Sequence, residues 1–132
     1  MVEQLPTARK PAVFVGTALE NLSAFPQEVK TTMGFAIHLA QVGEKHPDAK
    51  PLKGDKAFHG AGVLEVVERH DREAYRAVYT VKFAGVVYVL HAFQKKSKKG
   101  IATPSREIEL VKQRLKQARE HYEEHFAAKK TG

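Results

Sequence analysis

The stretch from Tyr75 to Lys99, YRAVYTVKFAGVVYVLHAFQKKSKK, decides the fold of this chain. Two runs rich in β-branched and aromatic residues, Ala74–Lys82 and Val86–Phe93, flank the short connection FAG at positions 83–85. Runs of this kind around a glycine-containing connection predict a β-hairpin. The second strand leads directly into the basic run Gln94–Lys99, so we expect positive charge at that end of the hairpin.

The side chains of this hairpin sort onto two faces when the connecting loop has an even number of residues. Val78 then pairs with His91, and Arg76 pairs with Phe93. Because side chains alternate with period two, one face is mixed and the other is almost wholly apolar. The mixed face holds Arg76, Val78, Thr80, Lys82, Val87, Val89, His91, Phe93 and Lys95. The apolar face, which we expect to pack against helices, holds Tyr75, Ala77, Tyr79, Val81, Val86, Tyr88, Leu90 and Ala92.

A three-residue loop is the alternative. It shifts the register by one residue and pairs Arg76 with Ala92, which scatters the polar side chains over both faces. In that case Arg76 and His91 are ordinary polar residues at a sheet edge. The even loop is favoured because it leaves one face apolar.

We expect the mixed face to bind RNA. Lysines attract phosphates in a salt-dependent way, and an aromatic ring such as Phe93 can stack on an unpaired base. Such a basic run is also typical of a solvated turn, and Lys56 is open to the same interpretation as ordinary loop polarity. The predicted RNA-binding residues are Phe93, Lys96, Lys98, Lys99, Lys82 and Lys56.

The same face holds the groups that a metal-free ribonuclease requires. Such an enzyme needs a base for the 2′-hydroxyl, a cation for the phosphorane and an acid for the leaving 5′-oxygen. Arg76 suits the cationic role, because a guanidinium can hold two phosphate oxygens. His91 can transfer protons near neutral pH, and Lys95 can assist either step. The alternative for His91 is a structural role, with its ring bonded to a neighbour at the end of the sheet.

Composition places the chain among small basic globular proteins. At 132 residues it is one domain, with residues 1–9 and 127–132 expected to fray. A net charge of +7 favours a polyanionic partner, nucleic acid above all. The chain has no cysteine, no apolar run long enough to span a bilayer and no signal-peptide pattern, so we expect a cytoplasmic protein. No cofactor or metal is expected.

One metal motif is present but carries little weight. Residues 121–125, HYEEH, match the H-x-x-E-H pattern of some zinc peptidases. No third ligand follows, and Tyr122 belongs to the apolar stripe of a helix.

The rest of the chain predicts two helices before the hairpin and one after it. A strand is expected at Lys10–Val15, helices at Thr17–Phe25 and from Pro26 to about Val42, a loop at Glu44–Gly62, a strand at Val63–Arg69 and a long helix opened by Thr103-Pro104. The fold class is therefore α+β, in the order β-α-α-β-β-β-α. An antiparallel sheet with helices packed on one face is expected.

The chain resembles the RelE/ParE superfamily, and within it the HigB-like, phage-associated branch of toxins from type II toxin–antitoxin systems. The resemblance spans roughly Val13 to Leu115. It rests on FPQEVKTTMGFAIHLAQVG, KPLKG, GAGVLEVVE, YRAVYTV, VYVLHAFQKKSKK and TPSREIELVKQRL. It implies a RelE-like fold, ribosome-dependent cleavage of messenger RNA, and neutralisation by a cognate antitoxin, often of the helix-turn-helix type.

By position, Arg76 matches the arginine of the family's Tyr-Arg-hydrophobic strand. The family's His-x-Phe-x-Lys-Lys segment is matched by His91, Phe93, Lys95 and Lys96. Relatives often read Glu-Leu-Arg on the preceding strand, whereas this chain has Glu65-Val66-Val67, with Arg69 two positions further on. That departure favours an alternative, a non-catalytic module that binds RNA or an antitoxin. A gyrase-inhibiting toxin of the ParE type is a third alternative.

Overall fold

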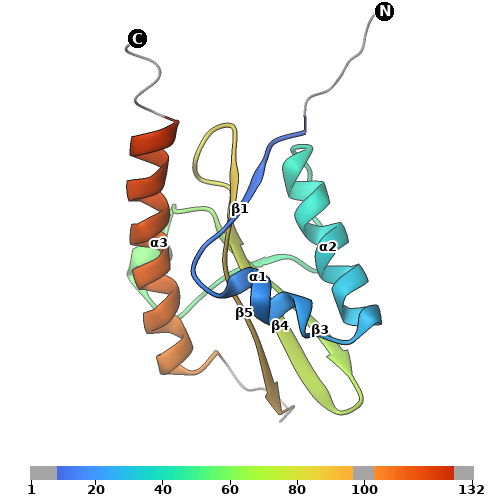
Figure 1. Cartoon of the computed structure of the whole chain (residues 1–132). Helices are drawn as coiled ribbons and strands as arrows, with labels where there is room; N and C mark the ends of the chain where they lie inside the picture. The colour runs from blue at the N-terminus through green and yellow to red at the C-terminus, as the bar shows by residue number, and fades with distance from the viewer. Residues whose placement is uncertain (1–8, 97–102, 127–132) are drawn as a thin grey trace, which may run out of the picture.

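The computed structural model describes residues 9–96 and 103–126, with the backbone alone for Lys95 and Lys96. Its helices and strands follow the predicted order with two additions, β2 and η1, in the segment expected to be a loop (Figure 1). The elements are β1 Ala12–Phe14, α1 Ala18–Ser23, α2 Gln27–Gln41, β2 Lys50–Pro51, the 3-10 helix η1 Lys56–Phe58, β3 Val63–His70, β4 Glu73–Thr80, β5 Val87–Lys96 and α3 Ser105–His125.

The sheet has five strands in the order β1-β5-β4-β3-β2, which confirms the α+β class. β3, β4 and β5 form the predicted antiparallel meander, and β1 lies at an edge as expected. β1 runs parallel to β5, with Ala12 beside Val87, so the sheet is mixed rather than wholly antiparallel. The short β2 covers β3 at Leu64 and Glu65 and forms the other edge.

Helices cover both faces of the sheet, so the expectation of helices on one face alone was wrong. α1 and α2 pack against one face, around Ala77, Tyr79 and Val89. α3 packs against the opposite face, where its apolar stripe meets Val78 and Leu90. The second layer forms because both faces of β4 and β5 are largely apolar, and a face of this kind has to be removed from water.

The predicted assignment of side chains to the two faces is correct on one side of a β-bulge in β5 and wrong on the other side. Val78 pairs with His91 and Arg76 with Phe93, as the even loop requires. Nearer the connection the ladder follows the other register and pairs Thr80 with Tyr88, because one extra residue of β5, Leu90, lies between the two registers.

The bulge moves residues between faces. Val87 and Val89 join the core under α1 and α2, whereas Tyr88 and Leu90 face α3. Arg76, Thr80, His91 and Phe93 stay on the face that had been predicted for them, but α3 now covers much of it.

The helices follow their apolar patterns. The residues of α2 that the spacing predicts to be buried are buried: Val29, Met33, Ala36, Ile37 and Ala40. Thr17 is the N-cap residue of α1, but its side chain makes no capping bond and instead accepts a hydrogen bond from Arg114 of α3. In the described residues, no helix is both long and apolar enough to cross a bilayer. The predicted frayed segments fall outside the described residues, apart from Arg9.

Candidate RNA-binding site

A groove of about 420 Å³ lies where the β2 edge of the sheet meets the start of α3. It is lined by Lys50, Pro51, Leu52, Lys53, Glu65, Arg76 and Thr103. The two lysines come from β2 and the loop after it, and both are exposed. The groove therefore combines one arginine, one carboxylate and two exposed lysines, a set that suits a phosphodiester.

At the groove, the side chains of Arg76, Glu65 and Thr103 form a hydrogen-bonded triangle. Its Nη1 donates to Glu65 Oε2 at 3.0 Å and to Thr103 Oγ1 at 3.3 Å. Thr103 in turn donates to Glu65 Oε2 at 2.7 Å. The side chains of Arg76 and Glu65 are only 11% and 15% exposed, so this is a largely buried ion pair and not the open charge that the sequence predicted. The two side chains are buried because Thr103 and the start of α3 lie over this face of the sheet.

The strand register explains the neighbourhood of Arg76. Val67, at the position where relatives often carry arginine, pairs directly with Arg76 across β3 and β4. Two rows further along the sheet, Arg69 pairs with Ala74, and Ala74 pairs with Lys95. The chain thus places positively charged residues in the row of Arg76 and again in the two rows next to the β3–β4 turn, where Lys96 pairs with Glu73.

His91 lies beside this triangle but beneath α3, and its residue is 4% exposed. Its Nε2 is 2.6 Å from Glu107 Oε1, and its Nδ1 is 3.2 Å from Arg114 Nη1. Arg114 can only donate, so Nδ1 is the acceptor and Nε2 carries the proton that it donates to Glu107. Both ring nitrogens are engaged inside the protein.

The protonation of His91 follows from the same contacts. Burial lowers the pKa of His91 below its usual value, with the nearby Arg114 charge adding to the effect and Glu107 opposing it. The geometry favours a neutral ring that positions α3 on β5, and the proton-transfer role of His91 stays a prediction.

Phe93 stacks on His91, with ring centroids 4.8 Å apart and an angle of 22° between the rings. The residue is 7% exposed. It also lines a shallow hollow of about 300 Å³ between α1 and β5, with Asn21, Phe25 and Gln94. Most of its ring is therefore used within the fold, which leaves an edge for a base.

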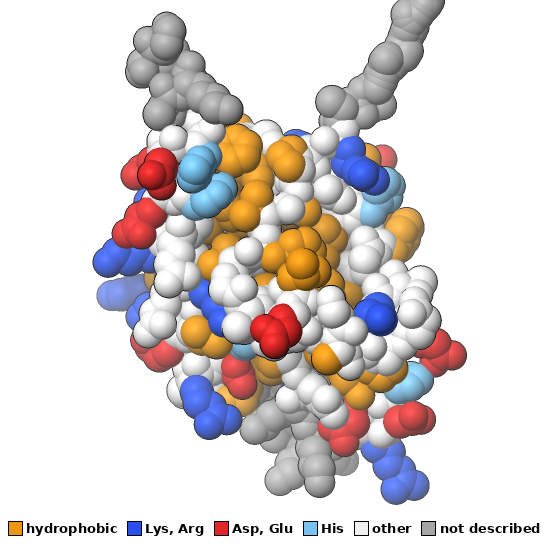
Figure 2. All heavy atoms as spheres, in the orientation of Figure 1, with side chains coloured by type: hydrophobic (Ala, Val, Ile, Leu, Met, Phe, Trp, Pro, Cys, Tyr) orange, Lys and Arg blue, Asp and Glu red, His pale blue; other side chains and the backbone are white. Residues whose placement is uncertain are grey.

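The predicted lysines are not all brought together. Lys95 and Lys96 end β5 near the β3–β4 turn, since they pair with Ala74 and Glu73. Lys98 and Lys99 lie outside the described residues. Lys82 is exposed at the opposite end of the hairpin, and Lys56 is exposed on η1. Figure 2 shows basic and acidic side chains interspersed along the outer edge of α3, not one basic surface.

Sequence reasoning missed three residues that build the site: Thr103, Glu107 and Arg114. The sequence does indicate a buried role for Arg114, because it falls within the apolar stripe of α3 between Val111 and Leu115. A charged residue at such a position needs a buried partner. Its guanidinium bonds Leu90 O at 3.1 Å and Thr17 Oγ1 at 3.0 Å.

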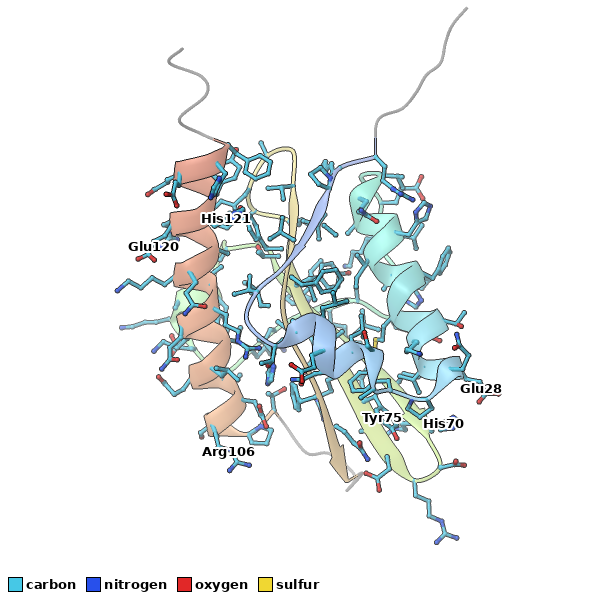
Figure 3. All side chains as sticks on the ribbon, viewed as in Figure 1. Glu28, His70, Tyr75, Arg106, Glu120 and His121 are labelled. Carbon is cyan, nitrogen blue, oxygen red and sulfur yellow. The ribbon has the colours of Figure 1, made fainter. Side chains whose placement is uncertain are left out.

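The H-x-x-E-H segment has a structural explanation. His121 Nδ1 lies 2.8 Å from the buried Tyr88 hydroxyl, and its ring is 4.3 Å from that of His125 (Figure 3). Within residues 9–96 and 103–126 no three candidate ligands gather around a possible metal position.

Comparison with known protein families identifies the family of this chain. The family model described as Phage derived protein Gp49-like (DUF891) matches residues 20–116, nearly three quarters of the chain. The protein therefore belongs to the Gp49-like phage-derived family, which is in general a family of RelE/ParE-like toxins. This confirms the resemblance at the level of the superfamily. A search among curated proteins found no significant match.

Proposed function

We propose that this protein is the toxin of a type II toxin–antitoxin system and belongs to its HigB-like branch. In this proposal it cleaves messenger RNA on the ribosome without a metal. Family membership supports the toxin class. The observation that carries the enzymatic part is the groove in which Arg76, Glu65 and two lysines converge.

The groove offers a base and a cation for cleavage at a 2′-hydroxyl. Glu65 takes the proton from the 2′-oxygen, which bonds to phosphorus while the bond from phosphorus to the 5′-oxygen breaks. Arg76 stabilises the charge that builds up on the phosphorane, and Lys95 protonates the leaving 5′-oxygen. The products are a 2′,3′-cyclic phosphate and a 5′-hydroxyl end. Lys50 and Lys53 hold the flanking phosphates.

A non-catalytic binding module remains a second candidate because of one observation. Arg76 is paired with Glu65 in a mostly buried triangle, and Val67 supplies no second guanidinium beside it. In this second candidate the same basic groove binds RNA or an antitoxin without chemistry.

The partners in this proposal are the ribosome with its messenger and a cognate antitoxin of the helix-turn-helix type, by analogy with the superfamily. An apolar strip is available for a protein partner: in Figure 2, hydrophobic side chains gather in the middle of the face where β1 runs between α3 and α2. Half-buried residues from β1, from the position after it and from α3 belong to the two cores there, including Phe14, Val15 and Tyr122. A small helix-turn-helix protein encoded beside this gene would support the pairing.

Controlled expression with mapping of messenger ends tests the proposal. Wild type is expected to arrest growth and to produce new ends within translated regions. The variant Glu65→Gln with Arg76→Gln keeps neutral hydrogen bonds in the groove but removes both charges, and it is expected to give neither effect. New ends at equal frequency in both proteins would contradict the assignment. A folded wild type that arrests no growth and yields no ends favours the binding module.

A further inference from the structure

The β3–β4 turn contains two residues other than glycine whose backbone φ angles are positive. His70 pairs with Glu73, so Asp71 and Arg72 are the two residues of the loop. Their φ angles are 50° and 68°, and every other position with positive φ in the described residues is a glycine. Two-residue hairpin loops with positive φ at both positions form a type I′ turn, which prefers Asn-Gly or Asp-Gly. Asp71 fits that preference, whereas Arg72 stands where glycine is preferred.

Among residues 9–96 and 103–126, no hydrogen bond or ion pair of Arg72 compensates for an arginine in this conformation. A left-handed backbone brings the Cβ of an L-residue too close to its carbonyl oxygen, and Arg72 is exposed, so it gains no packing in return.

The carboxylates around the turn contact His70 and Gln94, not Arg72. Asp71 Oδ2 is 3.4 Å from His70 Nε2, and Glu28 Oε1 is 3.2 Å from His70 Nδ1; Figure 3 shows His70 beside Glu28 at the start of α2. Glu73 accepts a hydrogen bond from Gln94 at 3.1 Å. A strained, exposed residue that the local structure does not require points to a role outside the fold.

The turn belongs to the end of the sheet that carries the positive charge. Glu73 and Ala74, directly after the turn, pair with Lys96 and Lys95, and Arg69 lies in the same row as Ala74. Figure 1 shows the β3–β4 hairpin extending beyond α1 and α2 at the end where β5 finishes. An RNA strand that occupies the groove at Arg76 and continues past Lys95 would reach the turn.

We propose that Arg72 is an RNA-contacting residue, which the rigid two-residue turn presents to a backbone phosphate next to the groove. This inference rests on the proposed function, because it assumes that RNA is the ligand. RNA is favoured over a protein partner because the neighbouring rows carry Arg69, Lys95 and Lys96, and a guanidinium can bind a phosphate through two hydrogen bonds. The chain thus keeps a strained arginine where glycine would stabilise the fold.

The test is Arg72→Gly, measured for both stability and binding. Relief of the left-handed strain should raise the Tm by about 4 °C. Binding to purified ribosomes that carry a 2′-O-methylated, non-cleavable messenger is then followed against NaCl concentration. Loss of one phosphate contact should reduce the salt slope by about 0.7 and the affinity about fivefold at 0.1 M salt. Arg72→Lys keeps the charge and the strain, and it should match wild type in the salt slope.

Lys45→Gln, which removes a charge from the loop after α2, is the control for net charge and should leave the slope unchanged. The inference is overturned if Arg72→Gly binds like wild type, if Lys45→Gln loses as much affinity, or if the Tm does not rise. Normal ribosome binding with weaker antitoxin binding would assign the turn to a protein partner and overturn it too. A wild type that does not bind programmed ribosomes would instead refute the proposed function itself, together with this inference.

Discussion

Arg76 is the residue whose environment differs most from expectation. The sequence predicted a cation on the mixed face of the hairpin, where it could hold phosphate oxygens. The structure pairs its side chain with Glu65 and Thr103 under the start of α3. An arginine in this setting serves both the fold and the groove, so a loss of activity in Arg76→Ala alone has two explanations.

A double-mutant cycle separates them. Arg76→Ala should lower the free energy of unfolding by about 2 kcal/mol, because it leaves a mostly buried carboxylate without its cation. Adding Glu65→Gln should recover about half of that loss, since the remaining group is neutral. Urea unfolding of the four proteins in the cycle gives both values. Strictly additive effects would mean that the two side chains do not stabilise each other in solution.

The burial of His91 predicts how the stability of the protein depends on pH. Because burial lowers its pKa in the folded protein, the unfolded chain binds a proton on this ring at a higher pH than the folded protein does. The contribution to stability is complete above about pH 6.5 and is lost as the pH falls from there toward the lowered pKa. One proton sets an upper limit of about 1.4 kcal/mol per pH unit on the slope over that window.

The variant His91→Gln should remove this part of the pH dependence, and His38→Gln, at an exposed position on α2, should not. Equal pH profiles for wild type and His91→Gln would contradict the buried, neutral ring. The same variant tests proton transfer: cleavage that persists at the wild-type rate, scaled for folded protein, would assign His91 a structural role.

Tyr79 carries a buried hydroxyl with no hydrogen-bond partner among the residues described. Burial raises its pKa to about 12. Tyr79→Phe should therefore be neutral or stabilising by up to about 1 kcal/mol, and it should remove a loss of stability that sets in as the pH rises from about 10 to 12. Tyr122→Phe is the matched control, because it loses a hydrogen bond to Ala84 O and should not stabilise. Calorimetry that shows Tyr79→Phe to be clearly destabilised would contradict the unpaired hydroxyl.

At the scale of elements, β5 shows what sequence patterns can and cannot provide. Alternation along the strand predicted the pairs of Arg76 and Val78 correctly. The bulge at Leu90 was not predictable, because Val87–Leu90 is apolar at every position and a shift of one residue changes no polarity there. The same uniform apolarity allowed α3 to pack on the face that was expected to bind RNA.

The basic end of β5 gives a prediction at this scale. Replacing Lys95, Lys96, Lys98 and Lys99 with Gln should reduce the salt slope of binding to programmed ribosomes by up to about 3. Lys82→Gln should leave it unchanged, because Lys82 lies at the opposite end of the hairpin. An unchanged slope in the quadruple variant would make this run a solvated segment.

For the whole molecule, the sequence predicted the class, the order of the long elements and the buried stripes of α2 and α3. Local patterns are sufficient for these because amphipathic spacing is read within one segment. The groove escaped prediction because it depends on contacts between distant segments: Thr103 meets Glu65, and the two residues of β2 bring Lys50 beside them. Arg76 was found from its strand position, but its partners, Glu65 of β3 and Thr103 just before α3, were not predicted because they meet it only in the folded chain.

The central claim is that the groove at Arg76 cleaves messenger RNA through a 2′-hydroxyl. The most direct measurement is a reconstituted reaction of the purified protein with ribosomes and an end-labelled messenger, with the chemical nature of the new ends determined. The account predicts cleavage on the ribosome that leaves a 2′,3′-cyclic phosphate and a 5′-hydroxyl. It predicts at least a hundredfold slower cleavage, by order of magnitude, for folded Glu65→Gln with Arg76→Gln. Ends with a 5′-phosphate, or an equal rate in that variant, would contradict it.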